Sequence, residues 1–506
     1  MLNSTVICFV DLNSPAQELN EPYALELLKG QLLSHFGESV SVMLMSTSMN
    51  SINEIYDVAF GADVLAFSLN NADTSLVNKI IACDGSPDRL ILFGGIYPTI
   101  GYKAILNQFQ DSVVVLGEGE KSIVEVLSCY MANRAEYRND MIANDVHGVV
   151  FNCNGKLYHS EPKVIDLAAV AHPSRDFIIQ HKGKFSGIAR IEASRGCSWG
   201  KCVFCGIKNR FCDSEKRVFS VNYVVDEIYK LNNLGIYKAF FNDEDFLDVE
   251  VPHLLTLLNG IIHANCSIEF FISTSVASIL NLEKKNMLKE VFNLMLLAGI
   301  KDVFLGVESG CATQLNRYNK GVSVAANEKA MSLVVGGGFK LDVGYILFDP
   351  YVTKTELLAN IEFIERMQNF GVDSRVLKKM LIIPGTEIHN KLISNGLLES
   401  ETDANSMYVG YNFYNPDIEH ICNEYETYEN KGKVSVGKFQ SIIRLEKNPQ
   451  KRIQYSKLLI DIRNIDLCVL KNIVYGNLDR TVLFKNKKKE MLHRIDELVC
   501  LTINVT

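Results

Sequence analysis

The chain has 506 residues, of which 47% are hydrophobic and 22% are charged, and its formal net charge is −8. A chain of this length exceeds a single compact core, so about two to four domains are expected. The composition is that of an ordinary globular protein, which argues against a fibrous or disordered chain.

The first residues, MLNSTVICFVDLNSP, lack the basic start, long apolar core and small-residue cleavage site of a signal peptide. No apolar run approaches the roughly 18 residues of a membrane span. The 13 cysteines are odd in number and irregularly spaced, which argues against a disulfide framework. We therefore expect a cytoplasmic protein with no membrane span, in which clustered cysteines serve metal binding or redox chemistry.

Residues 1–145 alternate short β-branched runs with stretches whose apolar residues recur at helical spacing. The expected strands lie at 4–12, 40–46, 63–71, 89–98 and 111–120, and the expected helices at 22–36, 51–62, 74–83 and 102–109. This alternation predicts an open, parallel, doubly wound α/β sheet of the Rossmann or flavodoxin type. Such sheets bind ligands beyond the carboxyl ends of their strands, where 66–74, 93–99 and 116–120 fall.

A polar stretch at 146–185, interrupted by HPSRDF at 172–177, is expected to be a linker. A second alternation of strands and helices follows at 186–390. Its strands are predicted at 187–195, 237–243, 268–274, 302–309, 341–349 and 374–383, with helices such as 224–235 and 354–371 between them. Six such units are fewer than the eight of a complete barrel, so an open, partial (β/α)6 barrel is expected.

The last part of the chain, 391–506, is expected to form a mostly helical domain. Residues 431–506 contain 16 Lys and Arg against 7 Asp and Glu, although the whole chain is negative. One interpretation is a solvated amphipathic helix, of which KNKKKEMLHRIDELV is typical. The other is an electrostatic seat for an acidic substrate or partner. Nucleic acid is not favoured, because no aromatic and basic binding motif accompanies the charge.

The stretch RGCSWGKCVFC, at 195–205, places Cys197, Cys202 and Cys205 directly after the first predicted barrel strand. Barrel enzymes carry their chemistry at this end of the strands. Three thiolates can bind three irons of a four-iron, four-sulfur cluster and leave the fourth iron open to a substrate or cofactor. The alternative is a closed structural zinc site with Cys212 as the fourth ligand.

This stretch resembles the signature of the radical SAM superfamily, C-x3-C-x-aromatic-C at the end of the first barrel strand. It differs in that four residues separate Cys197 from Cys202. The resemblance implies that the open iron of a [4Fe-4S] cluster chelates the amino and carboxylate groups of S-adenosylmethionine. It also implies that Phe204, directly before the third cysteine, lies beside the adenine.

Further segments resemble superfamily features at strand ends. In FFNDEDF, Asp243 and Asp245 match an acidic motif that accepts hydrogen bonds from the ammonium group of the methionine moiety; ordinary surface acidity is the alternative. In GVESG, Glu308 and Ser309 match polar residues that bind the ribose hydroxyls. Residues 342–349 match a strand that packs against adenine, with an ordinary core strand as the alternative.

The N-terminal segments FGGIYPT and LGEGE resemble the cobalamin-binding domain that one radical SAM subfamily carries before its barrel. The glycines would let the backbone approach the corrin or its nucleotide tail closely, and the serine would donate to it. The residues implied for this site are Ser68, Gly94, Gly95, Gly117, Glu118 and Gly119. No D-x-H-x-x-G motif is present, so the cobalt is expected to lack a histidine ligand. The alternative is a domain that keeps the fold without the cofactor.

The two resemblances cover roughly residues 1–390 and imply a cobalamin-dependent radical SAM enzyme. The implied activity is C-methyl transfer to an unactivated carbon of a peptide or natural product, through a 5′-deoxyadenosyl radical and methylcobalamin. Epimerisation, cyclisation or another rearrangement is the second hypothesis, and a zinc-stabilised binding protein is the third. The implied partners are a flavodoxin- or ferredoxin-type electron donor and a peptide or small-molecule substrate.

Overall fold

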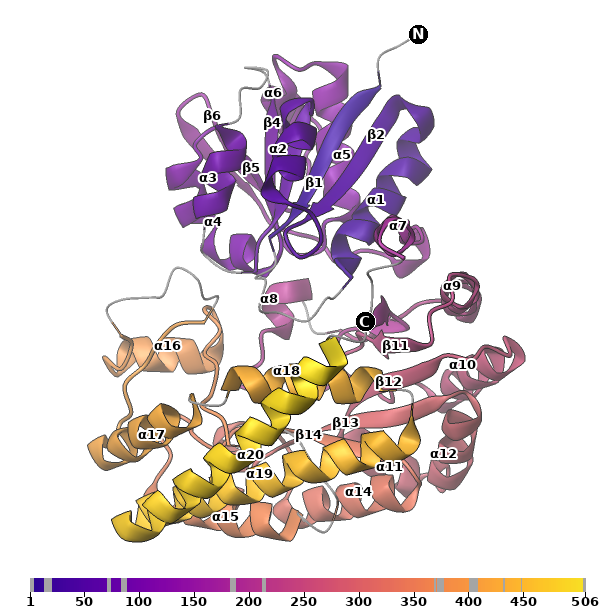
Figure 1. Cartoon of the computed structure of the whole chain (residues 1–506). Helices are drawn as coiled ribbons and strands as arrows, with labels where there is room; N and C mark the ends of the chain where they lie inside the picture. Colours follow the sequence, from indigo (N-terminus) through magenta and orange to yellow (C-terminus); the bar gives the residue numbers. More distant parts are fainter. Residues whose placement is uncertain are drawn as a thin grey trace. The chain divides into compact units, whose positions relative to one another are not determined.

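The computed structural model describes residues 4–12, 21–70, 74–82, 89–182, 188–211, 215–367, 370, 377–399, 408–430, 433–446 and 448–503. The chain divides into two compact units, whose elements are labelled in Figure 1. The first unit comprises Met1–Glu269, Ile382–Lys391 and Ser400–Gly410. The second comprises Phe270–Leu381, Leu392–Glu399 and Tyr411–Thr506.

The first unit begins with a seven-stranded sheet in the order β2-β1-β3-β4-β5-β6-β7. Its strands are β1 (Thr5–Asp11), β2 (Val40–Ser46), β3 (Val64–Ser68), β4 (Leu90–Gly94), β5 (Val113–Val115), β6 (Val149–Cys153) and β7 (Lys156–Ser160). The helices along it are α1 (Tyr23–Phe36), α2 (Ile52–Phe60), α3 (Ser75–Ile81), α4 (Ile96–Gln108), α5 (Glu120–Ala132) and α6 (Tyr137–Ala143). Strands β1 to β5 are parallel, so the predicted doubly wound sheet is confirmed.

Side chains of the interior strand β1 alternate between two separate cores, because successive residues of a strand point to opposite faces. Ile7 and Phe9 pack with α1, α5 and α6, whereas Cys8 and Val10 pack with α2, α3 and α4. Figure 1 shows helices on both sides of this sheet. Strand β2 lies on one side of β1 and β3 lies on the other, so the order of strands reverses at β1 and β3. Doubly wound sheets bind ligands at such a switch point.

The sheet continues past the predicted domain boundary at residue 145. The stretch 146–185, predicted to be a linker, contains β6 and β7, which pair antiparallel with each other, and β6 pairs with β5. Asn154 and Gly155 join them with φ values of 51° and 73°, as in a two-residue type I′ hairpin turn. An Asn-Gly pair between two apolar runs is a strong hairpin signal, and the linker prediction overlooked it.

The end of this stretch contributes a buried arginine. Arg175 is 2% exposed and donates to both carboxylate oxygens of Glu21 at 2.7 and 2.8 Å and to Glu227 at 2.7 and 3.1 Å. Glu21 precedes α1, and Glu227 lies on α9 (Val221–Asn233). Arg175 also donates to the carbonyl of Arg190, on β8 (Ala189–Ile191), at 2.8 Å. This arginine therefore joins the N-terminal sheet to the first elements of the second alternation.

The rest of the first unit contains the start of the predicted barrel. Strand β8 pairs in parallel with β11 (Lys238–Phe241). The short strands β9 (Ser194–Arg195) and β10 (Arg217–Val218) pair antiparallel. The remaining helices of this part are α7 (Asp176–Gln180), α8 (Ile207–Phe211) and α10 (Val251–His263).

The second unit continues the alternation of parallel strands and helices. Strand β13 (Ile300–Glu308) pairs in parallel with β12 (Glu269–Ser275) and with β14 (Lys340–Tyr345). The helices of this part are α11 (Val276–Lys284), α12 (Leu288–Leu297), α13 (Ala312–Arg317), α14 (Val324–Gly336) and α15 (Lys354–Met367). The sixth predicted strand, 374–383, begins outside the described residues and is represented by one parallel bridge between Phe348 and Lys379. The expected α/β class is confirmed.

The C-terminal part is helical, as predicted. Its helices are α16 (Glu387–Ser394), α17 (Pro416–Glu429), α18 (Lys433–Leu445), α19 (Pro449–Tyr475) and α20 (Leu478–Ile503). Apolar side chains of α18, α19 and α20 form their own small core around Phe439 and Ile495. In the part of the chain that the structure describes, no helix combines the length and the apolar character that crossing a membrane requires.

Candidate functional site

The three cysteines of the predicted cluster lie on one loop between β9 and α8, residues 196–206, which we call the cysteine loop. None of the three forms a disulfide; Cys197 and Cys202 are half-buried and Cys205 is exposed. The N–H of Cys205 donates to the carbonyl of Cys202 at 3.1 Å. Gly196 and Gly200, with φ of 93° and 51°, supply the left-handed backbone that this loop needs in order to turn. The three cysteines therefore lie together on one loop after a strand, as the sequence predicted.

The thiols are not arranged as ligands of a single metal ion. Among the described residues, no three His, Cys, Asp or Glu side chains are gathered closely enough to hold one ion. Cys212, the fourth ligand of the zinc alternative, lies outside those residues. A zinc ion needs its ligands in one tetrahedral sphere, whereas a four-iron cluster takes each cysteine on a different iron. Three cysteines on one loop, none of them in a disulfide, fit the ligand chemistry of such a cluster.

The predicted acid pair, Asp243 and Asp245, follows β11 and is buried, so surface acidity does not describe it. Asp243 accepts from the N–H of Ala193 at 3.0 Å and from the hydroxyl of Ser194. Burial raises the pKa of Asp243 to about 6, against the opposing effects of Lys216 and of these hydrogen bonds. The backbone carbonyl of Asp245 accepts from the Lys216 ammonium at 2.5 Å. Asp243 thus supports the backbone at residues 193–194, which leads into the cysteine loop.

Two neighbouring acids, not selected from the sequence, bind the cysteine loop itself. Glu244 accepts from the N–H of Gly196 at 3.2 Å, and Asp248 accepts from the N–H of Ser198 at 2.7 Å. Burial raises the pKa of Glu244, although its ion pair with Arg210 at 3.0 Å opposes the rise. Both acids belong to the same acidic run, 243–248, and that run is the signal that could have identified them.

Two aromatic residues lie on the cysteine loop. Phe204, predicted to lie beside the adenine, is half-buried. Its neighbour Val203 accepts from the N–H of Ile388 at 3.1 Å, which fixes this end of the loop. Trp199, the only tryptophan of the chain, is 40% exposed, with the Lys201 ammonium 5.2 Å from its ring centre.

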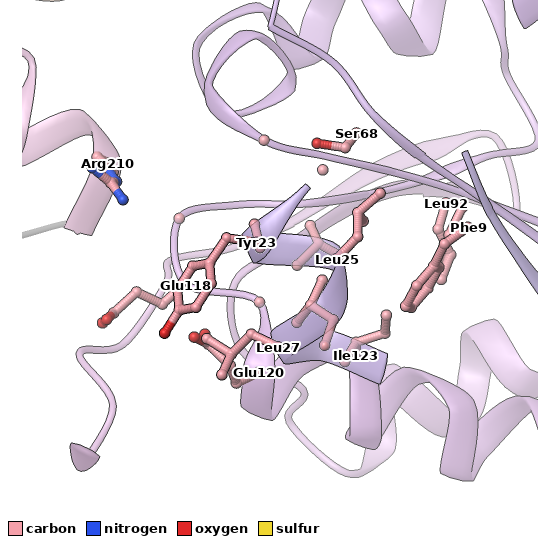
Figure 2. A pocket seen from close by; sticks show the side chains of 18 of the residues that line it. Phe9, Tyr23, Leu25, Leu27, Ser68, Leu92, Glu118, Glu120, Ile123 and Arg210 are labelled. Atoms are coloured by element: carbon pink, nitrogen blue, oxygen red, sulfur yellow. The ribbon is translucent and has the colours of Figure 1, made fainter. Parts of the chain in front are cut away.

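A cavity of about 260 Å³ lies at the carboxyl ends of β3, β4 and β5 (Figure 2). Its lining contains every residue predicted for a cofactor in this domain, namely Ser68, Gly94, Gly95, Gly117, Glu118 and Gly119. Figure 2 shows an apolar part of the lining, with Phe9 and Leu92, and an acidic part, with Glu118 and Glu120. Among the described residues, no histidine contributes to this lining.

The two glycines at the end of β4 have different roles. A Cβ atom on Gly94 would meet no other atom within 4 Å, so this residue faces open space. Gly95 has a φ of 105°, and its Cβ would lie 2.8 Å from the carbonyl oxygen of Leu69. Gly117 also has a positive φ, 63°. The backbone itself therefore requires glycine at 95, whereas glycine at 94 leaves room for an occupant of the cavity.

Arg195, two residues before Cys197, joins the cavity lining to the cysteine loop. It is 4% exposed, and its guanidinium donates to Glu118 at 2.7 Å, to Glu120 at 2.7 Å and to Glu192 at 2.9 and 3.0 Å. Burial lowers the pKa of Arg195, but the three carboxylates outweigh that effect and raise it well above its ordinary value. We call Arg195 and these three glutamates the arginine cluster.

The arginine cluster changes the interpretation of Glu118. The sequence selected this residue for cofactor binding, but its carboxylate also accepts from Arg217 at 3.1 Å and from the N–H of Ile165 at 3.3 Å. Its oxygens are thus engaged within the protein while the residue lines the cavity. Sequence reasoning missed Arg195, Glu120 and Glu192. Glu118 and Glu120 lie 77 and 75 positions from Arg195 and give no local signal of pairing with it, whereas Glu192 lies three positions away, within the predicted strand 187–195.

The two predicted ribose ligands lie in the second unit. Glu308 ends β13 with a φ of 65°, a conformation that few residues other than glycine adopt, and its carboxylate pairs with Lys320 at 2.9 Å. Ser309 is fully buried, and its hydroxyl lies 2.5 Å from the side-chain oxygen of Gln314 and 2.9 Å from that of Asn360. Glu308 is therefore the more accessible of the two, while the Ser309 hydroxyl is engaged within the protein.

Sequence comparison finds distant relatives, although no family model matches the chain. The chain is 24% identical over 331 residues to 4′-phospho-dehydrooxetanocin synthase of Priestia megaterium, which covers 60% of this chain and 43% of that protein. It is 26% identical over 341 residues to hopanoid C-3 methylase of Methylococcus capsulatus. That alignment covers 65% of this chain and 61% of the methylase. These alignments span less than two thirds of each relative's length.

Solved structures match over more of the chain. OxsB, a cobalamin-dependent S-adenosylmethionine radical enzyme with aqua-cobalamin bound, matches 98% of this chain and 81% of its own, with a TM-score of 0.81 and 19% identity. A second match is TsrM of Kitasatospora setae, a radical S-adenosylmethionine methyltransferase with cobalamin and a [4Fe-4S] cluster bound. The match covers 78% of this chain and 75% of TsrM, with a TM-score of 0.59 and 15% identity. The predicted resemblance in fold to cobalamin-dependent radical SAM enzymes is confirmed.

Proposed function

We propose that this chain, which has the fold of cobalamin-dependent radical SAM enzymes, is such an enzyme and transfers a methyl group to an unactivated carbon. One arrangement carries the proposal. Three clustered cysteines on the cysteine loop, none of them in a disulfide, and a glycine-lined cavity belong to the same compact unit, and Arg195 contacts the lining of the cavity two residues before the first cysteine. Because a fold alone does not specify a reaction, the proposal rests on this pairing of sites.

The cysteine loop would hold a [4Fe-4S] cluster through Cys197, Cys202 and Cys205, with the fourth iron left open. When bound, the cluster supplies the electron that cleaves S-adenosylmethionine and so starts radical chemistry. The protein's part is to fix the loop, which Glu244 and Asp248 do through its backbone N–H groups. None of the ten described cysteines forms a disulfide, which supports a reducing, cytoplasmic location.

Side chains at strand ends would bind S-adenosylmethionine. In this proposal Asp243 and Asp245 accept from its ammonium group, Phe204 lies beside the adenine, and Glu308 and Ser309 bind the ribose hydroxyls. The left-handed backbone of Glu308, held by the pair with Lys320, supports its role, because such strain is concentrated at functional sites. The burial of the Asp243 carboxylate supports its assignment to the acidic motif rather than to surface acidity.

The cavity would bind cobalamin by one edge of the corrin or by its nucleotide tail, beside Ser68 and the glycines at 94, 95, 117 and 119. The open space at Gly94 fits such an occupant. The lack of a histidine among the described lining residues fits a cobalt that has no imidazole ligand from the protein. When bound, cobalamin supplies a methyl group that a carbon radical can accept.

The relatives of this chain are named for different reactions. One is named a C-3 methylase and another a synthase, so similar chains need not share one product. The second candidate function is therefore a radical rearrangement, such as cyclisation or epimerisation, started at the same site.

The C-terminal helices offer a seat for an acidic substrate or partner. A cavity of about 660 Å³ has three lysines of α20, Lys485, Lys488 and Lys489, and one glutamate of α17, Glu424, in its lining. Lys488 forms an ion pair with Asp466 at 2.8 Å, whereas within the described part of the chain Lys485 and Lys489 form no ion pair. An unpaired positive charge attracts an anionic group. A flavodoxin- or ferredoxin-type protein would deliver the electron, and the substrate would be a peptide or small molecule.

The proposal is tested by anaerobic reconstitution with iron, sulfide and cobalamin, followed by incubation with S-adenosylmethionine, a reductant and candidate substrates encoded nearby. The expected products are 5′-deoxyadenosine and a substrate heavier by about 14 Da, the mass of one added CH₂. Deoxyadenosine with a product of unchanged mass would favour epimerisation. A cluster-loaded protein that forms no deoxyadenosine would overturn the proposal.

A further inference from the structure

The arginine cluster spans the two sites of the proposed enzyme. On one side, Glu118 and Glu120 flank Gly119, and all three line the cavity. On the other side, Arg195 is followed directly by Gly196 and Cys197. The guanidinium binds Glu118 and Glu120 of the cavity segment and Glu192 through charged hydrogen bonds of 2.7 to 3.0 Å, while the backbone of Arg195 leads directly into the cysteine loop.

The cluster gives Arg195 little freedom to move independently of either segment. Its planar fork engages three carboxylates at once, which a single ammonium group cannot do. The rings of Phe219 and Phe211 lie 5.6 and 6.0 Å from the guanidinium carbon. Withdrawing Arg195 would leave Glu118, Glu120 and Glu192 buried together without it, which is strongly unfavourable. The cavity segment and the base of the cysteine loop are therefore held in one arrangement.

We infer that Arg195 is a positioning residue that couples the cavity to the cysteine loop, so that cobalamin and the cluster each bind more tightly when the other is present. The inference rests on the proposed function. A cluster fixes the cysteine loop and, through Arg195, the segment 117–120 that lines the cavity. Cobalamin then binds to a segment that is already ordered, and the same coupling holds in reverse.

Arg175 supplies a matched control for Arg195. Both are buried arginines of the first unit, 2% and 4% exposed, and both are held by glutamates from distant parts of the chain. The hydrogen-bond partners of the Arg175 guanidinium, Glu21, Glu227 and the carbonyl of Arg190, belong neither to the described lining of the cavity nor to the cysteine loop. Its contact with the lining is the ring of Tyr23, whose centre lies 5.3 Å from the guanidinium carbon. Arg175→Lys keeps the positive charge, so it would weaken the fold in a similar way without removing a hydrogen bond to either site.

The test measures the dissociation constant of hydroxocobalamin for iron-free and for cluster-loaded protein, by anaerobic equilibrium dialysis. In the wild type, cluster loading should tighten cobalamin binding by about tenfold, a typical coupling between two sites. In Arg195→Lys, which keeps the charge but loses the fork, the ratio of the two constants should fall to near one. In Arg175→Lys the wild-type ratio should persist.

A second variant covers the possibility that Arg195→Lys does not fold, as judged by circular dichroism. Glu120→Gln keeps the size of the side chain and removes one charge of the cluster on the cavity side, so it should also lower the ratio. A wild-type ratio of one, or a ratio unchanged in both variants, would overturn the inference. Cluster-loaded wild-type protein that binds no cobalamin at all would instead overturn the proposed function, so the two failures are distinguishable.

Discussion

The cysteine loop and the cavity use opposite features of the chain. The loop depends on side chains that are present: three thiols, and the acids Glu244 and Asp248 that hold its backbone. The cavity depends on a side chain that is absent, since Gly94 faces open space. The loop should therefore fail when atoms are removed, and the cavity should fail when atoms are added.

Removing a thiol tests the first half of this comparison and should have the largest effect. Cys197→Ala, Cys202→Ala or Cys205→Ala should each abolish cluster absorbance and all formation of 5′-deoxyadenosine, since each thiolate holds one iron. Visible absorbance and chromatography of the products measure both. Cys212→Ala is the control and should leave both intact. A normal cluster in any of the three variants contradicts the assignment, and a requirement for Cys212 would favour zinc.

The contribution of Asp243, which binds the backbone before the cysteine loop, to the stability of the fold should depend on pH. The pKa of Asp243 is about 6 in the folded protein because of burial, and its ordinary value is 3.8. The folded state therefore binds the proton more tightly, and the contribution of Asp243 to stability falls as pH rises from about 4 to about 7. Over this pH range the free energy of unfolding of the wild type should fall by about 3 kcal/mol relative to that of Asp243→Asn. Urea unfolding of iron-free protein over this pH range measures it.

Glu227 provides the control of opposite sign for that experiment. Burial raises its pKa, but hydrogen bonds to His172 and the charge of Arg175 outweigh burial and hold it at about 2. The stability that it contributes is present above its ordinary pKa of 4.5 and is lost as pH falls towards 2. If Glu227→Gln and Asp243→Asn changed the pH profile in the same direction, the account of both carboxylates would be wrong.

Adding atoms to the cavity tests the second half of the comparison. Gly94→Val should weaken cobalamin binding at least tenfold, about 1.4 kcal/mol, because its methyl groups enter the space that the ligand needs. The cluster and reductive cleavage of S-adenosylmethionine should survive, while methylated product is lost. Gly61→Val is the control, since Gly61 also faces open space and has an ordinary φ of −86°. Wild-type cobalamin affinity in Gly94→Val would refute the placement of the ligand.

The smallest expected effect concerns Glu308, in the second unit. Lys320→Met removes the cation that orients this carboxylate. The dissociation constant of S-adenosylmethionine should rise about fivefold, roughly 1 kcal/mol, with the iron content unchanged. Isothermal titration of the cluster-loaded protein measures it. Lys329→Met, which breaks the more exposed pair with Glu283, should leave the affinity unchanged, and an equal loss in both variants would argue against a role for Glu308.

Local patterns predicted most of the fold, and they placed the cysteine loop and the residues of the cavity after strand ends, where the structure has them. Continuous apolar runs such as 4–12 predicted the buried parallel strands, and the glycines after them predicted the cavity. The hairpin of β6 and β7 was missed because the polar residues around Asn154 and Gly155 outweighed their turn signal. Glu118 was assigned to a cofactor because its partner Arg195 lies 77 residues away, and sequence periodicity carries no information on such pairs.

The central claim is that one chain binds both an iron–sulfur cluster and a corrinoid. The most direct measurement is the iron, cobalt and zinc content, by mass spectrometry, of protein reconstituted anaerobically with iron, sulfide and hydroxocobalamin and then desalted. The account predicts about four irons and one cobalt per chain, with no stoichiometric zinc. One zinc per chain, with neither iron nor cobalt retained, would contradict it.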